Sequence, residues 1–324
     1  MNNSFKSKIG PLLSSYLAFK RSLKYKLVSV EALLVDLDNY IFSNYPEATT
    51  LTQEIVYGWG FPKDSNALPQ TINKRLALLT NLGKFLSISN PDTFILSKKE
   101  RLSEEKSFIS RVLTKEEVEN LFYEADRYES DGRYAGLTLS VVLRLMYTTG
   151  MRPGEVLRLG LNDYNPDTGE IFIKESKSLK SRRIIISQEV ANLMDKYLEI
   201  TCNAVSDRDK FLFTIDGNRS ERINSSWLNS KVKTLSKLAM LNPPFPRPYD
   251  FRHTFITTRI LQWINEGKDI NIMIPFLRIY VGHDSVNDTW YYFKLIPQHS
   301  NLISNITTLR NAIIPDIKDN DYEK

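Results

Sequence analysis

The sequence contains a single cysteine, Cys202, among 324 residues, which excludes an intrachain disulfide and a zinc site built from several thiolates. Its three histidines, His253, His283 and His299, are too few for a histidine-rich metal centre. No run of about 20 apolar residues occurs, so the sequence predicts no membrane span. We therefore expect no metal, no other cofactor and no membrane partner.

Basic residues slightly outnumber acidic ones, with 43 Lys+Arg against 38 Asp+Glu and a net charge of +5. This balance favours an anionic partner such as nucleic acid, although an ordinary mildly basic enzyme has the same balance. Near the N-terminus, apolar residues recur at helical spacing over 9–17. Lys20-Arg21 then stands where a signal peptide needs small residues. The expected location is therefore cytoplasmic.

The length favours two domains, and the pattern changes along the chain. Residues 1–100 are typical of an all-helical unit, with helices over about 4–25, 28–44, from about 50, and 68–89. The segment GWGFPKDSNALP has the composition of a loop. Residues 90–111 are charged, open with Asn-Pro and lack clear periodicity, which indicates a linker.

The second part mixes helices with a small amount of strand. Thr114 and Glu117 have capping-box spacing, and a later apolar helix ends at Gly150. A further helix is expected from MRPGEVLRLGL. EIFIKES and RRIIIS read as two strands joined by the basic loop KSLKS. Helices are then expected over QEVANLMDKYLEI, over 253–266 and over INIMIPFLRIYV. The predicted fold class is mainly α with a small β-sheet or hairpin (α+β).

Side chains suited to phosphodiester chemistry stand where these elements begin or end. Such cleavage needs a nucleophile, cations on the non-bridging oxygens and a proton for the leaving oxygen. Arg152, in TGMRPGE, lies between a helix end and a helix start, where its guanidinium can hold two phosphate oxygens. The alternative is a surface arginine near a helix cap.

The basic hairpin supplies a candidate proton donor, Lys177. Lys174, Lys180, Arg182 and Arg183 lie close to it and are candidates for holding DNA phosphates. The alternative is a solvated basic hairpin without a ligand.

Two histidines and a second arginine follow. Arg252, in PYDFRHTFITTR, is a candidate for a second fork on the same phosphate, whereas His253 is more typical of a buried structural histidine. His283 follows Gly282 in a turn, where it can donate to a phosphate oxygen with a pKa near working pH. A lone turn histidine is also commonly structural.

The segment VGHDSVNDTWYY carries two candidate nucleophiles, Tyr291 and Tyr292. A phenol is a poor nucleophile at pH 7, but nearby arginines and a histidine would lower its pKa. One tyrosine should pack into the core and the other should face the cleft. The residues themselves leave the choice open.

In this order, TTGMRPGEVLRL, the hairpin lysine, DFRHTFIT and VGH…Y resemble the tyrosine recombinase (phage integrase) family. The resemblance covers about residues 110–305. The first part is similar in size and position to the family's helical core-binding (SAM-like) domain. The implied organisation is a core-binding domain over 1–100, a linker over 101–110, a catalytic domain over 111–305 and a tail over 306–324.

The resemblance assigns roles to individual positions. The family's first arginine, hairpin lysine, second arginine and turn histidine match Arg152, Lys177, Arg252 and His283. The family nucleophile usually falls nine residues after that histidine, which selects Tyr292 over Tyr291. The histidine of the H-x-x-R motif is replaced by Tyr249, which can hydrogen-bond but supplies no positive charge.

The family mechanism implies a site-specific recombinase that needs no metal or ATP and works through a 3′-phosphotyrosyl intermediate. The implied partners are double-stranded DNA, a homotetramer on paired sites and an accessory directionality protein. Two alternatives remain open. One is a catalytically impaired DNA-binding accessory protein of the same fold, which Tyr249 permits. The other is a type IB topoisomerase-like enzyme.

Overall fold

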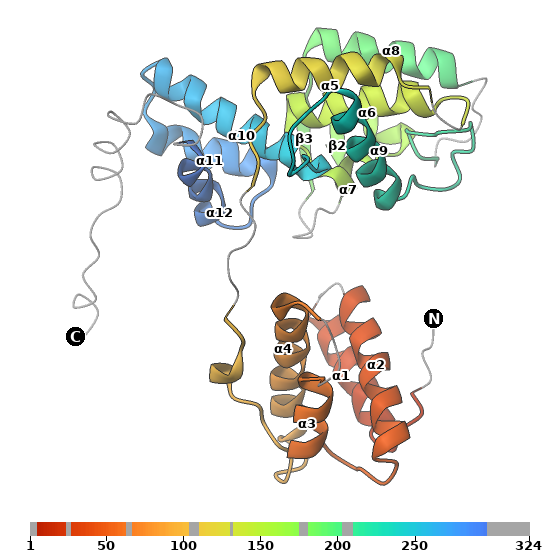
Figure 1. The fold of residues 1–324 in the computed structure, drawn as a ribbon, viewed down its shortest axis with the longest axis vertical. Helices are drawn as coiled ribbons and strands as arrows, with labels where there is room; N and C mark the ends of the chain where they lie inside the picture. The colour runs from red at the N-terminus through yellow and green to blue at the C-terminus, as the bar shows by residue number, and fades with distance from the viewer. Residues whose placement is uncertain are drawn as a thin grey trace. The chain divides into compact units, whose positions relative to one another are not determined.

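The computed structural model describes residues 5–23, 27–62, 67–103, 110–129, 132–174, 181–202 and 210–296. The chain divides into two compact units, Met1–Ile109 and Ser110–Lys324 (Figure 1). Each unit has apolar clusters of its own.

The first unit is helical, as expected. Its helices are α1 (Gly10–Ser22), α2 (Val28–Asn44), α3 (Gln53–Gly60) and α4 (Pro69–Leu86), followed by the 3₁₀ turn η1 (Lys98–Glu100). Leu13, Leu37, Trp59 and Leu79, one from each helix, are buried in a single cluster. The predicted loop segment begins too early, because its first three residues, 58–60, still belong to α3.

The second unit surrounds a small sheet with helices. Its helices are α5 (Lys115–Arg127), α6 (Ala135–Thr149), α7 (Pro153–Val156), α8 (Gln188–Thr201), α9 (Ser225–Leu238), α10 (Pro248–Asn265), α11 (Ile270–Val281) and α12 (Val286–Trp290). The strands are β1 (Tyr164–Asn165), β2 (Glu170–Ile173) and β3 (Arg182–Ile185), and the 3₁₀ turns are η2 (Leu161–Asp163) and η3 (Tyr291–Lys294).

The three strands form an antiparallel sheet in the order β1-β2-β3. Ile173 pairs with Arg182, so residues 174–181 connect the two longer strands. Helices account for most of the rest (Figure 1). The predicted fold class, mainly α with a small sheet, is confirmed.

Helix α6 is the central element of the second unit. It is buried on almost every side and packs against α5, α8 and α10. A helix that is apolar all round is typical of a domain core. It ends at Gly150, which has φ +64°, and a Cβ there would lie 2.3 Å from Phe255 Cδ1. Only glycine fits this C-cap, and the tight end brings the Gly150 carbonyl to α10.

Several local predictions hold and others do not. The capping box of α5 is present, with Thr114 Oγ1 accepting from Glu117 N at 3.2 Å and Glu117 Oε2 accepting from Thr114 N at 3.0 Å. Helix α7 is only one turn long. Helix α10 begins at Pro248 rather than at His253, because Asp250 Oδ2 caps its start by accepting from Arg247 N at 2.8 Å.

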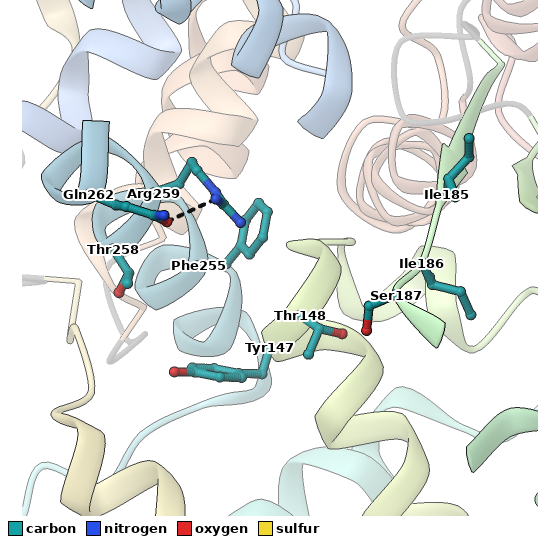
Figure 2. Close-up of a pocket in the computed structure, with 9 residues that line it drawn as sticks. All are labelled: Tyr147, Thr148, Ile185, Ile186, Ser187, Phe255, Thr258, Arg259 and Gln262. Carbon is teal, nitrogen blue, oxygen red and sulfur yellow. Dashed lines mark hydrogen bonds between the residues drawn. The ribbon is translucent and has the colours of Figure 1, made fainter. Parts of the chain in front are cut away.

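Among the described residues, no helix is both long and apolar enough to cross a bilayer. A cavity of about 330 Å³ lies between the end of α6, the end of β3 and α10 (Figure 2). Phe255 and Arg259 line it, and Arg259 Nη1 donates to Gln262 Oε1 at 2.8 Å. None of the predicted catalytic residues lines this cavity, so the candidate chemistry lies elsewhere in the unit.

Candidate active site

Arg252, on the first turns of α10, is the most deeply buried charge of the second unit, with 0% of its surface exposed. Its Nη1 donates to Gly150 O at 2.7 Å and its Nη2 to Val281 O at 2.8 Å. These carbonyls end α6 and α11, where the helix dipole is negative. The helix ends thus hold a guanidinium that has no carboxylate within ion-pair distance among the described residues.

The carboxyl end of α11 gathers the arginines of the site. Three successive carbonyl oxygens accept hydrogen bonds from three different guanidinium groups. The pairs are Tyr280 O with Arg182 Nε at 2.8 Å, Val281 O with Arg252 Nη2 at 2.8 Å, and Gly282 O with Arg152 Nη2 at 2.5 Å. One helix end therefore fixes side chains that come from β3, α10 and the start of α7.

Gly282 makes this arrangement possible. It adopts φ +69° at the C-cap of α11, and a Cβ there would lie 2.8 Å from Arg182 Nη1. Both the left-handed backbone and the close guanidinium exclude a side chain at this position. The next residue, His283, is thereby turned toward the cluster.

Glu155 is the carboxylate that joins two of the arginines. Its side chain is buried, and it accepts from Arg152 Nη1 at 2.8 Å and from Arg182 Nη1 and Nη2 at 3.1 and 2.8 Å. Burial alone would raise the pKa of Glu155, but Arg182 and then Arg152 outweigh it and lower the pKa to about 2. The carboxylate is therefore ionised throughout the physiological range.

The site is nevertheless positive, since Glu155 pairs with Arg152 and Arg182 while Arg252 has no carboxylate partner among the described residues. The Arg152 side chain keeps 16% of its surface exposed, so its guanidinium is accessible to a ligand. Burial by itself lowers the pKa of Arg152, and the hydrogen bond and charge of Glu155 more than offset this, so that the pKa is raised. An anion entering here meets fixed positive charge in a region with little water.

Tyr292 lies against this cluster. Its side chain is 3% exposed, and its Oη is 3.0 Å from His253 Nδ1. The His283 ring stacks on it at 5.8 Å between centroids. Burial raises the pKa of the Tyr292 phenol above its ordinary value despite the opposing charge of Arg252. The expectation that the surrounding cations lower this pKa was therefore wrong, because loss of solvent outweighs the charges.

Tyr291 has a different environment. It is 39% exposed, and its hydroxyl lies 3.3 Å from Ser110 Oγ. One tyrosine of the pair is buried in an apolar cluster and the other is partly exposed to solvent. The buried one is Tyr292, the tyrosine that contacts Arg252 and the two histidines.

His283 does not have a pKa near working pH, contrary to expectation. Burial, followed by the charges of Arg252 and Arg152, lowers the pKa of His283 to about 3. Its Nδ1 is 2.8 Å from Thr289 Oγ1. When Nδ1 accepts from the Thr289 hydroxyl, the neutral imidazole carries its proton on Nε2 and can donate it to a phosphate oxygen.

Tyr249 occupies the first turn of α10, where it is partly exposed. Its ring lies 5.0 Å from that of His253, one turn further along the same helix face. The phenol thus borders the cluster, but it adds no positive charge to it.

The basic hairpin is only partly within the described residues. Lys177 and Lys180 lie outside them. Lys174 Nζ is 2.7 Å from Asp163 Oδ1, and Arg183 Nη1 is 3.0 Å from Glu170 Oε1, with both basic side chains mostly exposed.

Arg182 is a correction to the predicted DNA-contacting set. Its side chain is buried, and all three of its nitrogens donate within the protein, to Tyr280 O and Glu155. The alternation of a strand explains this, since neighbouring residues point to opposite faces and Arg183 takes the solvent side. Arg182 therefore acts as an internal support of the site in this structure.

The sequence did not predict that Glu155 and His253 take part in the site. Glu155 follows Arg152 at the spacing of a capping box, and its Oε2 accepts from Arg152 N at 2.9 Å. That spacing was a usable signal. The contact between His253 and Tyr292 had none, because 39 positions separate the two residues in the chain.

Comparison with known proteins identifies the family. The model of the phage integrase family matches residues 111–299, more than half of the chain. The chain belongs to the phage integrase family. The putative integrase/recombinase y4rE of Sinorhizobium fredii is 24% identical over 289 residues, which cover 88% of this chain and 91% of that protein. Tyrosine recombinase XerD of Rickettsia conorii is 22% identical over 301 residues, covering 90% and 95%.

Solved structures of family members share the fold. The XerH site-specific recombinase in a post-cleavage complex with a palindromic difH substrate has a TM-score of 0.62 at 17% identity, covering 95% of this chain and 91% of that one. A lambda integrase dimer bound to a COC′ core site has a TM-score of 0.58 at 17% identity, covering 87% and 76%. The resemblance inferred from the motifs is confirmed. The protein is a tyrosine recombinase, an enzyme of DNA strand breakage and rejoining.

Proposed function

We propose that this recombinase cuts and rejoins DNA at specific sites with Tyr292 as its nucleophile. The observation that supports this most strongly is the cluster itself. The Tyr292 phenol lies beside buried Arg252, with the His283 ring stacked on it. Arg152 is tied to the same helix end that holds Arg252. A phosphate placed between these groups has a nucleophile and its stabilising donors within reach.

The proposed reaction conserves bond energy. Tyr292 Oη attacks the scissile phosphorus and forms a 3′-phosphotyrosyl bond, while the bond to the 5′-oxygen breaks. Arg152 and Arg252 stabilise the negative charge of the pentacoordinate phosphorus, and His283 donates a hydrogen bond to it. Lys177, in the β2–β3 connection, protonates the 5′-oxygen. A 5′-hydroxyl from a second strand then reverses the step.

The biological assembly we propose is a homotetramer on two paired sites in double-stranded DNA, working in the cytoplasm with an accessory directionality protein. Residues 1–100 serve as the core-binding domain and 111–305 as the catalytic domain, joined by the linker 101–110. Structural relatives in complexes with DNA motivate this proposal. Lys174, Lys180 and Arg183 are the proposed phosphate contacts of the hairpin.

A nicked suicide substrate tests the nucleophile, because loss of the short 5′ fragment traps the covalent intermediate. The wild-type protein should form an adduct whose modified peptide contains Tyr292. Tyr292→Phe should bind the same DNA with unchanged affinity and form no adduct. Tyr291→Phe, one residue away and solvent-facing, is the matched control and should retain adduct formation.

The same substrate separates the alternatives. DNA binding without any adduct in the wild-type protein would identify a catalytically impaired accessory protein. Rapid relaxation of supercoiled DNA without a specific site would indicate a type IB topoisomerase-like activity. Recombination between two sites, with an adduct on Tyr292, supports the proposed function.

A further inference from the structure

His253 lies where a proton acceptor for the nucleophile is needed. Its Nδ1 is 3.0 Å from Tyr292 Oη, and the side chain is buried. His253 and Tyr249 are one turn apart on α10, with ring centroids 5.0 Å apart. The position that carries the H-x-x-R histidine in the family motif holds Tyr249 here. An imidazole is thus present one turn later, on the same face, in contact with the phenol.

The neighbouring groups are poorly suited to take this proton. Arg252 has donors only. Tyr249 is itself a phenol, so it is a weak base at neutral pH. His283 Nδ1 is 2.8 Å from Thr289 Oγ1. Of the described groups around the Tyr292 hydroxyl, His253 combines hydrogen-bond distance with a basic lone pair.

The electrostatics set the protonation states of the two groups at pH 7. Burial raises the pKa of the Tyr292 phenol, so spontaneous ionisation at pH 7 is rare and the attack requires a base. Burial, and then Arg247 and Arg252, lower the pKa of His253 to about 4, so its imidazole is neutral and can accept a proton. Among the described residues, the titratable or charged groups around it are Arg247 at the N-cap of α10, Tyr249 and Arg252 of α10, His283 after α11 and Tyr292 of η3.

We propose that His253 accepts the phenolic proton of Tyr292 as the phenol attacks the scissile phosphate, so that it serves as the general base of this recombinase. This inference rests on the proposed function, because it requires Tyr292 to be the nucleophile. Tyr249 leaves the role to the histidine one turn further on.

The step balances. The Oη–phosphorus bond forms, the bond from phosphorus to the 5′-oxygen breaks, and the phenolic proton moves to His253 Nδ1. The 5′-oxygen receives its proton from Lys177. The imidazolium then faces the phosphate, whose negative charge offsets that of the new cation. In the rejoining step His253 returns the proton to the tyrosine oxygen as that oxygen leaves.

The pH dependence of cleavage tests this role. The substrate is a nicked duplex with a 5′-bridging phosphorothiolate, whose sulfur leaves without protonation, so that Lys177 does not shape the profile. Single-turnover cleavage by the wild-type protein should be flat between pH 6.5 and 9. His253→Ala should be slower by about 10²-fold or more at pH 7. Its rate should also rise about tenfold per pH unit, because hydroxide must then remove the phenolic proton.

Two further variants separate the loss of a base from a folding defect. His253→Gln keeps the hydrogen bond but is not a base, so it should match His253→Ala in slope while binding DNA like the wild type. Thr257→Val, a buried isosteric change one turn along α10, should leave rate and slope unchanged. Added imidazole, or Tyr249→His in the His253→Ala background, should restore part of the lost rate.

The outcomes are distinct. If the wild-type protein forms no adduct on Tyr292, the proposed function itself fails. If the wild type reacts but His253→Gln keeps a flat profile, His253 is not the base, whether its rate is normal or reduced. A reduced rate with a flat profile would mean that His253 only positions the phenol.

Discussion

At Tyr292 and its two histidines, burial acts on three pKa values in opposite directions. It raises the pKa of the phenol and lowers those of both imidazoles. Each group is therefore neutral at pH 7, because exclusion of water disfavours every charged form. Among the described residues, the positive charge of the site comes from its arginines. In the proposed mechanism, the negative charge of the bound phosphate offsets the imidazolium that the proton transfer creates.

Lys177→Ala should slow cleavage of an ordinary phosphodiester by about 10²- to 10⁴-fold, because the 5′-oxygen then leaves without a proton. Cleavage of a 5′-bridging phosphorothiolate should change little. The ratio of the two single-turnover rates measures the effect. Equal slowing of both substrates would exclude Lys177 as the general acid.

At the scale of elements, the site forms where the ends of three helices meet. The carboxyl ends of α6 and α11 supply carbonyl oxygens, and the start of α7 supplies Arg152 and Glu155. Strand β3 adds Arg182 from the sheet side. Because exposed carbonyls at helix ends need donors, arginines satisfy them and become fixed at the same time.

Glu155→Gln should lower the free energy of unfolding of the second unit by about 3–5 kcal/mol at pH 7, because two desolvated arginines lose their carboxylate. Glu170→Gln is the matched control. It removes the partly exposed partner of Arg183, the residue that follows Arg182 on β3, and should cost less than about 1 kcal/mol. Hydrogen exchange of the α6 amides reports both changes. Equal effects of the two substitutions would contradict a structural role for Glu155.

Acid should destabilise the second unit from about pH 6.5 downward. The pKa values of His253 and His283 are lowered from 6.5 to about 4 and about 3, so the unfolded chain binds protons first and stability falls with pH. Glu155, lowered from 4.5 to about 2, contributes stability that is present above 4.5 and lost below it. Denaturation midpoints from pH 7 to 4 measure this fall. His253→Gln should reduce its slope, since glutamine takes up no proton.

At the scale of the whole molecule, net charge and exposed basic side chains govern the encounter with DNA. The chain carries +5, and the exposed arginine and lysine next to the hairpin are paired only with nearby carboxylates. The pair of Arg183 with Glu170 lies at the surface and is weak, whereas Lys174 contacts the buried carboxylate of Asp163. Buried Arg182, with its donors occupied, contributes to the fold instead.

DNA affinity should fall steeply with salt, with log K decreasing linearly in log salt concentration through release of counterions. Arg183→Gln should weaken binding similarly for all sequences and reduce the slope by about 1. Fluorescence anisotropy between 50 and 200 mM salt gives both quantities, as a range of roughly fourfold in concentration is enough for such slopes. A flat response would count against phosphate binding by this surface.

Much of the architecture was predictable because its signals are local. Helix α2 has the predicted bounds, and Gly150 ends α6 as expected. Helix α9 was missed although Leu228, Val232 and Leu235 follow a helical spacing, because lysines and serines fill the rest of it. Strand β1 is only two residues long, too short to leave a periodic pattern.

By itself, the sequence determined the family, the mainly helical fold and the candidates for phosphate chemistry, since each depends on residue types at fixed spacing. Tertiary structure alone decided which of them are buried, and hence their pKa values. It turned Arg182 inward, set His253 against Tyr292 and collected three guanidinium groups on one helix end. These outcomes depend on solvent exclusion and on contacts between distant segments. Neither produces a local signal in the sequence.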